Sequence, residues 1–276
     1  MAPPPGHHAH DHAADDLLPR LLALDAILHR GLLDEAIEAV AAHTGPLTAL
    51  LDVGAGVGTG TFALAARFAD ALVTAVDSSA EMLASVRAGA AARGLAGRVT
   101  TLRADASAPD GWFVEPVDLV WTANALHEVT DPTVTLRNMR RSLRPGGVLA
   151  VLEMNGPPMV LPAEFSALET ALRSAAGADS APPDWAPLIA DAGFTLVEQR
   201  SLVGDQLLAA DGPGGEYAAL ELRRLARHGG DALPPADRSR LRAIVTDLNE
   251  RAAGRPGHWR TVHIRGSRTL WLARRP

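Results

Sequence analysis

A run of alternating glycines directly behind an apolar segment constrains this chain more than any other feature. Residues 47–53 are largely apolar and predict a buried strand, and a helical pattern follows from residue 61. Between them stand four glycines, at 54, 56, 58 and 60. Glycine is needed where a turn adopts unusual backbone angles or where a ligand approaches the main chain without a Cβ in the way. The segment therefore predicts a strand-to-helix turn that closely approaches a ligand.

The glycine spacing separates two classes of nucleotide-binding loop. The dinucleotide fingerprint G-x-G-x-x-G is not matched, because Thr59 occupies its third glycine position. With Asp52 two residues before Gly54, the segment fits the pattern D-x-G-x-G-x-G and resembles class I S-adenosylmethionine (SAM) methyltransferases. A nicotinamide-dependent oxidoreductase on a similar fold is the less favoured alternative, because both Asp52 and the glycine spacing speak against it.

Apolar strands alternate with helical patterns along most of the chain. The strands are expected at 48–53, 72–76, 98–102, 117–122 and 147–153, and helices at 59–69, 79–94, 125–127 and 132–143. A further helix is expected at 185–192, a sixth strand at 194–203, two helices at 215–228 and 234–253, and a final strand from 261. Such alternation predicts a doubly wound α/β sheet. The resemblance implies a seven-stranded Rossmann-like methyltransferase sheet whose last strand is antiparallel, with helical N-terminal and C-terminal caps.

The pattern also predicts a division into segments. Residues 1–14 form a disordered, His-rich tail, 15–45 a helical lid, 46–203 the SAM-binding core, 204–259 a helical cap and 260–276 the final strand. The lid and cap are expected to close over the carboxyl edge of the sheet and to shape the acceptor pocket. Four histidines of the tail, at 7, 8, 10 and 12, suit weak metal binding, but no physiological metal site is expected there.

The predicted strands end in polar residues, at the edge where open α/β sheets bind ligands. The resemblance implies that Asp52 contacts the methionine part of SAM, that Asp77 accepts the ribose hydroxyls and that Asp105 faces the adenine amino group. The rest of the implied cofactor-binding set consists of Gly54, Ala55, Gly56, Gly58, Ser78, Met82, Ala106 and Asn124. Asp77 or Ser78 as a helix N-cap, and Met82 as a core residue, stay open as structural alternatives.

The segment 122–129, behind the fourth strand, resembles the region next to the transferred methyl group in small-molecule methyltransferases. It lacks the [N/D]-P-P-[Y/F] signature of adenine and nucleic-acid amino methyltransferases. We predict His127 as a general base, because an imidazole with an ordinary pKa near 6.5 suits that role, and Glu153 as the second catalytic residue. His258 and His263 are further candidate bases, and a packed core histidine is the structural alternative for His127.

Composition narrows the class of function. A formal net charge of −6 and the absence of a basic stripe argue against nucleic-acid binding. Without cysteine there are no disulfides or thiol nucleophiles, and no uninterrupted apolar run has the ~18 residues of a membrane span. All 26 basic residues are arginine, which is typical of a GC-rich, actinobacterium-like genome. We expect a cytoplasmic enzyme, a monomer or homodimer, acting on a small molecule in specialised metabolism; a non-catalytic SAM-binding or metal-binding regulator is the alternative.

Overall fold

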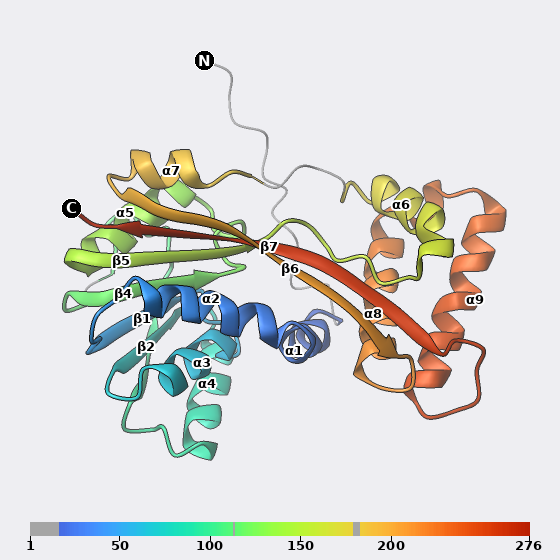
Figure 1. Cartoon of the computed structure of the whole chain (residues 1–276), viewed down its shortest axis with the longest axis horizontal. Coiled ribbons are helices and arrows are strands. Elements are labelled where there is room, and N and C mark those ends of the chain that lie inside the picture. Colours follow the sequence, from blue (N-terminus) through green and yellow to red (C-terminus); the bar gives the residue numbers. More distant parts are fainter. Residues whose placement is uncertain (1–16, 113, 179–182) are drawn as a thin grey trace.

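The computed structural model describes residues 17–112, 114–178 and 183–276 and is built around one mixed sheet (Figure 1). Its seven strands lie in the order β3-β2-β1-β4-β5-β7-β6. Their bounds are β1 Ala49–Val53, β2 Leu72–Asp77, β3 Val99–Arg103, β4 Val117–Ala123, β5 Leu143–Met154, β6 Thr195–Ala209 and β7 Thr261–Arg274. Neighbouring strands among β1 to β5 pair in parallel, and β7 is antiparallel to both β5 and β6. The predicted sheet and its reversed last strand are thereby confirmed.

Helices cover both faces of the sheet, as right-handed parallel crossovers require. One face packs against α2 (Arg30–Ala42), α3 (Thr59–Arg67) and α4 (Ala80–Ala92), and the other against α5 (Pro132–Ser142) and α7 (Ala186–Asp191). The central strands are buried on both sides; β4, for example, has six consecutive buried residues. Local capping fixes where two of these helices begin: Ser79 accepts a hydrogen bond from the Met82 amide, and Asp131 accepts one from the Val134 amide.

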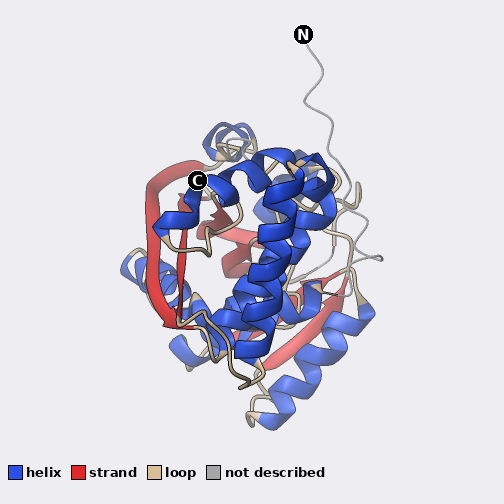
Figure 2. Cartoon of the chain, turned by 90° about the vertical axis from the view of Figure 1, so that its right-hand side faces the viewer, coloured by secondary structure: helices blue, strands red, loops and turns tan. Residues whose placement is uncertain are grey.

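The last two strands run on beyond the sheet and carry a second hydrophobic core (Figures 1 and 2). We call this projecting part of β6 and β7 the arm. The helices around the arm are α1 (Leu18–Leu28), α6 (Ser166–Ala175), α8 (Pro213–Gly229) and α9 (Pro235–Ala252), with short 3-10 turns η2 (Ala163–Phe165) and η3 (Gly230–Ala232). Fully buried side chains of this cluster include Leu172, Leu222 and Leu248, and none of them belongs to the clusters on the sheet faces. We call this second cluster the cap core.

The structure revises several of the expected boundaries. β6 continues to Ala209, so the division expected at residue 204 falls inside a strand. The expected lid at 15–45 is split, because α1 joins the cap core whereas α2 packs on the sheet. Residues 125–127 are not helical, and residues 126–128 form a turn between β4 and α5. α6 was not expected, and it fills the segment between β5 and α7.

No helix among the described residues is long and apolar enough to cross a membrane. The expected disordered tail at 1–14 lies outside the described residues.

Candidate active site

The glycine loop between β1 and α3 has the backbone conformation that its composition predicts. Gly54, Gly56 and Gly58 have φ values of 72°, 52° and 91°, a region that residues with a Cβ rarely adopt. A Cβ on Gly54 would lie 2.3 Å from the Cβ of Ala125, so the loop packs directly against the segment behind β4. A Cβ on Gly56 would meet nothing within 4 Å. The middle of the loop thus borders open space, and this is the side on which a ligand can approach the main chain.

Asp77, the last residue of β2, is tied to this loop. Its Oδ2 accepts a hydrogen bond from the Gly56 amide at 2.9 Å, and its Oδ1 accepts one from the Ser79 amide at 2.8 Å. The helix N-cap is therefore Ser79, and neither Asp77 nor Ser78 fills that position. Because carboxylate oxygens have more than one lone pair, these bonds leave Asp77 able to accept further hydrogen bonds. The half-buried carboxylate stands at the ligand-binding edge of the sheet.

The other predicted strand-end residues lie along the same edge. Asp105 follows β3, is exposed, and accepts a hydrogen bond from the Ser107 amide at 2.8 Å. The carbonyl of Ala106 accepts one from the Asn138 side chain, and Met82 stands half-buried in the first turn of α4. These residues follow β2 and β3, which pair directly with each other, and β2 also pairs with β1. The parallel register therefore gathers the adenosine-binding residues that the resemblance implied.

Asp52 has more enclosed surroundings than the sequence suggested. Its carboxylate is 2% exposed, and its Oδ2 accepts a hydrogen bond of 2.6 Å from the hydroxyl of Thr61, in the first turn of α3. Burial raises the pKa of Asp52 to about 6, although the bonds from Thr61 oppose this rise. In this structure the Asp52 side chain is hydrogen-bonded to the first turn of α3, directly behind the glycine loop. A direct contact with an ammonium group stays a prediction.

Asn124, immediately behind β4, combines two unusual features. It has a positive φ of 49°, and among described residues it is the non-glycine residue with that conformation. Its buried Oδ1 has no hydrogen-bond partner in the part of the chain that the structure describes. Unsatisfied buried acceptors and strained backbone cluster at sites where a ligand completes the bonding. Asn124 therefore fits its predicted place beside the cofactor.

His127 lies between two carboxylates. Its Nδ1 is 2.6 Å from Oε2 of Glu153, and its Nε2 is 3.1 Å from Oε1 of Glu128. Glu153, 3% exposed at the end of β5, is anchored by accepting the amides of Ala125 and Leu126 at 3.0 and 2.7 Å. The structure thus brings the two predicted catalytic residues into contact.

The protonation state of His127 differs from the expectation. Partial burial lowers its pKa, but the hydrogen bonds that the ring donates to Glu128 and Glu153, together with the charges of both carboxylates, more than offset this and raise the pKa to about 10. The expected titration near 6.5 is therefore wrong for this conformation. At neutral pH the side chain is an imidazolium, which donates hydrogen bonds and cannot accept a proton.

The two further candidate bases lie elsewhere. His263 is on β7 in the arm, with Nε2 2.6 Å from Asp205 of β6, and His258 lies beyond α9, where its amide donates to Asp247. Neither is brought to the strand ends that hold His127. The described residues contain no group of three or more histidine, cysteine or acidic side chains placed to hold a metal, and the tail histidines lie outside those residues.

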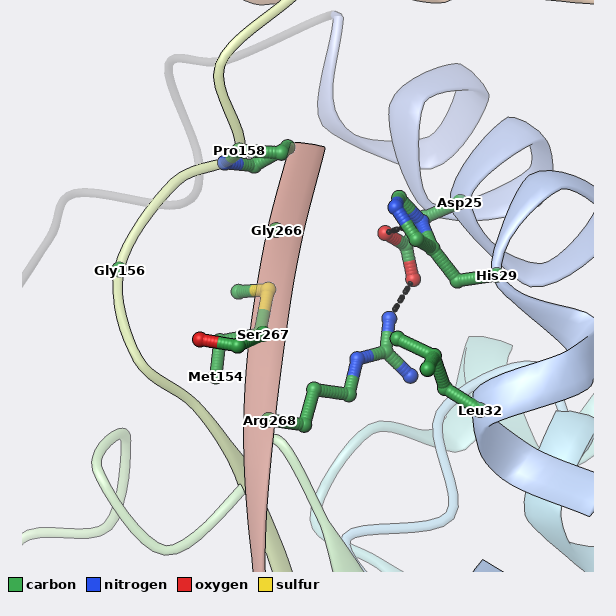
Figure 3. Close-up of a pocket in the computed structure, with 9 residues that line it drawn as sticks. All are labelled: Asp25, His29, Leu32, Met154, Gly156, Pro158, Gly266, Ser267 and Arg268. Atoms are coloured by element: carbon green, nitrogen blue, oxygen red, sulfur yellow. Dashed lines mark hydrogen bonds and ion pairs between the residues drawn. The ribbon is translucent and has the colours of Figure 1, made fainter. Parts of the chain in front are cut away.

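Sequence reasoning missed a second polar group, shown in Figure 3, where α1 meets β7. Arg268 of β7 donates from Nη2 to Oδ2 of Asp25 at 2.5 Å, and His29 and Tyr217 adjoin the other carboxylate oxygen. Since Asp25 and Arg268 lie 243 positions apart, no local pattern links them.

Comparisons with known proteins agree with this geometry. The family described as "Methyltransferase domain" matches residues 50–147, roughly a third of the chain. A trans-aconitate 2-methyltransferase of Azoarcus sp. is 39% identical over 103 residues, covering 37% of each chain. A demethylmenaquinone methyltransferase of Thermus thermophilus is 38% identical over 148 residues, covering 52% of this chain and 62% of that one. The chain thus spans less than two thirds of the length of these relatives.

Among solved structures, a SAM-dependent methyltransferase of Geobacter sulfurreducens bound to S-adenosylhomocysteine superposes with a TM-score of 0.50. The match has 20% identity and covers 94% of this chain and 98% of the other, which shows a shared fold. Residues 50–147 therefore match a methyltransferase domain, and the chain shares the fold of class I SAM-dependent methyltransferases. Small-molecule methyltransferases are among the relatives that it matches. The match to the methyltransferase family supports SAM as the cofactor.

Proposed function

We propose that this protein transfers a methyl group from SAM to a small-molecule acceptor. The observation that carries the proposal is the glycine loop: its middle residue, Gly56, borders open space and donates its amide to Asp77 at the end of β2. A cofactor that joins a nucleoside to a charged group needs two features of the protein: a main-chain segment that it can approach closely and a carboxylate beside that segment. SAM supplies an activated methyl group on a sulfonium, so the protein's task is to align the acceptor and to exclude water.

The residues divide this task along the carboxyl edge of the sheet. Asp77 is proposed to bind the ribose hydroxyls, with Asp105, Ala106, Ser78 and Met82 around the adenine. The Gly54–Gly58 loop, Asn124 and the enclosed Asp52 are proposed to hold the methionine portion. The orphaned Oδ1 of Asn124 and the open side of Gly56 are the features of this structure that fit such a ligand.

His127 and Glu153 are proposed to act at the acceptor. With both carboxylates in place the imidazolium orients a ligand by donating a hydrogen bond. An acceptor that displaces Glu128 from Nε2 would remove one of the two charges that hold the proton, and the pKa of His127 would fall toward neutrality. The buried Glu153 would keep the ring in place throughout. Base catalysis is therefore proposed to depend on acceptor binding, and an acceptor that is already deprotonated needs no base.

The acceptor itself is proposed only as a class. The relatives' names refer to trans-aconitate and demethylmenaquinone, which differ widely, so they favour a small organic molecule without selecting one. An acidic chain without a basic stripe favours such a molecule over nucleic acid. A cytoplasmic location, a role in specialised metabolism, and a monomeric or homodimeric state are further proposals.

The test is calorimetric titration with S-adenosylhomocysteine. Wild type should bind, and Asp77→Ala should weaken binding by about 10-fold or more, because hydrogen bonds to a charged group contribute about 1.5–3 kcal/mol. Asp70→Ala is the matched control, since Asp70 is exposed in the turn before β2 and should leave binding unchanged. If wild type does not bind, or if both variants bind as wild type does, the proposed cofactor site is refuted. Binding without methyl transfer to any acceptor would favour a non-catalytic SAM-binding protein.

A further inference from the structure

The carboxylate of Asp52 lies in the interior of the protein, where water does not solvate it. Asp52 is 2% exposed, and its strand β1 is paired on both sides, with β2 and with β4. Directly opposite Asp52 on β4 stands Trp121, which is fully buried. Because burial disfavours the charged form of a carboxyl group, an anion at this position depends on hydrogen bonds from the protein.

Thr61, the third residue of α3, supplies those hydrogen bonds. Its hydroxyl donates to Oδ2 of Asp52 at 2.6 Å, and its backbone N–H is a second donor to the same carboxylate. Thr61 is itself fully buried. The N–H groups in the first turn of a helix have no partner within the helix, and this positive end of the helix favours an anion. Both bonds from Thr61 lower the pKa of Asp52, against the effect of burial.

The surroundings leave no room for a replacement of the Thr61 hydroxyl. A Cβ on Gly60 would lie 2.9 Å from Nε1 of Trp121 and 3.1 Å from Oδ2 of Asp52, so the space between α3 and the carboxylate is closed. The indole N–H of Trp121 borders this space but has no hydrogen-bond partner among the described residues. Asp77, at the end of β2, acts against ionisation, because its negative charge raises the pKa of Asp52. Within the described chain, Thr61 is thus the side chain that donates to Asp52.

We propose that Thr61 is a positioning residue for the cofactor: it holds the Asp52 carboxylate charged and oriented, so that Asp52 can bind the ammonium group of SAM. The proposal rests on the proposed methyltransferase function and deepens it. Thr61 acts through Asp52 and does not itself contact the cofactor. Since a protonated carboxyl group has no charge to attract an ammonium group, the affinity for the cofactor should increase with pH as Asp52 ionises.

The experiment is calorimetric titration with S-adenosylhomocysteine between about pH 5 and pH 7, where the ammonium group of that ligand stays charged. The affinity of wild type should increase with a midpoint near pH 6, the pKa of Asp52. Thr61→Val keeps the shape of the side chain but loses the hydroxyl, which should raise the midpoint by about one pH unit. Wild type should then bind about 9-fold more tightly than the variant at pH 5 and only about 2-fold more tightly at pH 7.

Two further variants separate this role from a merely structural one. Thr61→Ser keeps the hydroxyl and should restore the wild-type midpoint. Thr59→Val, in the same turn of α3, removes a hydroxyl that makes no hydrogen bond to the described residues, and it should leave the midpoint unchanged. If Thr61→Val weakens binding by the same factor at every pH, or if either of the other variants moves the midpoint as Thr61→Val does, the proposal is overturned.

Two more variants keep the test decisive if Thr61→Val does not fold. Thr61→Cys has a thiol that donates only weakly, so its midpoint should lie above that of wild type. Asp52→Asn can still accept from Thr61 but cannot ionise, so its affinity should be lower than that of wild type and should lose the midpoint near pH 6. A wild-type midpoint in either variant overturns the proposal. Absence of S-adenosylhomocysteine binding in wild type would instead refute the proposed function.

Discussion

Replacing Glu153 with glutamine should lower the pKa of His127, because it removes a buried charge with little change of shape. Glu153 uses Oε1 for the amides of Ala125 and Leu126 and Oε2 for Nδ1 of His127. The glutamine carbonyl can keep both amide bonds, which leaves its NH₂ group facing the imidazole. Since two donors cannot share one hydrogen bond, Nδ1 must then lose its proton to accept. The substitution therefore removes an acceptor as well as a charge.

The structure sets the size of the effect. Two carboxylates together raise the pKa of His127 from 6.5 to about 10 despite the opposing effect of burial. Removing one of them should remove about half of that rise. Because the His127 side chain is 36% exposed, solvent screens the charges, and we expect a fall of about one to two pH units. Glu128→Gln is the comparison, and its fall should be smaller because Glu128 is 36% exposed and lies at 3.1 Å.

The assay is an NMR pH titration of imidazole ¹⁵N shifts in histidine-labelled protein, with the His127 signal assigned from its loss in His127→Gln. Wild-type His127 should stay protonated throughout the neutral range. A wild-type pKa near 6.5, or a Glu153→Gln value equal to that of wild type, would refute the electrostatic reasoning. Stability gives a second readout of the same linkage. Because the folded pKa lies above the unfolded one, the stabilisation from His127 is complete below about pH 6.5 and disappears as pH rises through about 10.

Four further substitutions test the fold. Gly54→Ala should lower the free energy of unfolding, measured by chemical denaturation, by about 2–4 kcal/mol, because its Cβ would meet Ala125 at 2.3 Å and φ is positive. Gly56→Ala has open space around its Cβ, so it should lower the free energy of unfolding by only about 1 kcal/mol while weakening S-adenosylhomocysteine binding. Burial raises the pKa of Asp118, but backbone hydrogen bonds and the charge of Arg144 lower it further, so the folded pKa lies below the unfolded value near 3.8. The ionised side chain should therefore stabilise the fold above pH 3.8, and this stabilisation should disappear as pH falls through the folded pKa. In acid denaturation Asp118→Asn should lose less stability with falling pH than wild type does. Leu222→Ala should destabilise the cap core by about 2–5 kcal/mol and leave S-adenosylhomocysteine affinity unchanged. If the affinity for S-adenosylhomocysteine fell together with the stability, the separation of the two cores would be contradicted.

The geometry of the proposed cofactor site was accessible from sequence because it is made of local features. A strand, a glycine loop and a helix follow one another within twenty residues, and the positive φ values of Gly54 and Gly56 confirm what their composition demanded. Asp77 and Asp105 each end a strand, and parallel pairing alone brings such positions to one edge. Local chemistry therefore predicted both the residues and their meeting place.

The boundaries of the cap were not accessible in this way. Gly204 suggested the end of a strand, yet it pairs with Gly266 in a ladder that continues to Ala209. That ladder is stabilised by β7, more than fifty residues later, and by the cap core around its tip. The protonation of His127 was missed for the same reason, since its shift depends on Glu153, a residue on another strand. Tertiary pairing decided each of these features against the local signal.

The same distinction explains why the sequence indicates a reaction class more readily than an acceptor. The proposed cofactor contacts come from consecutive β–α units, whose geometry any member of the fold must reproduce. The cap core is different, because it needs a helix from one end of the chain, a strand from the other and the segment behind β5 to meet. A change in the length of β6 or β7 would move α8 and α9, and with them α1, without altering the glycine loop. Acceptor specificity can therefore diverge while the proposed cofactor site stays constant.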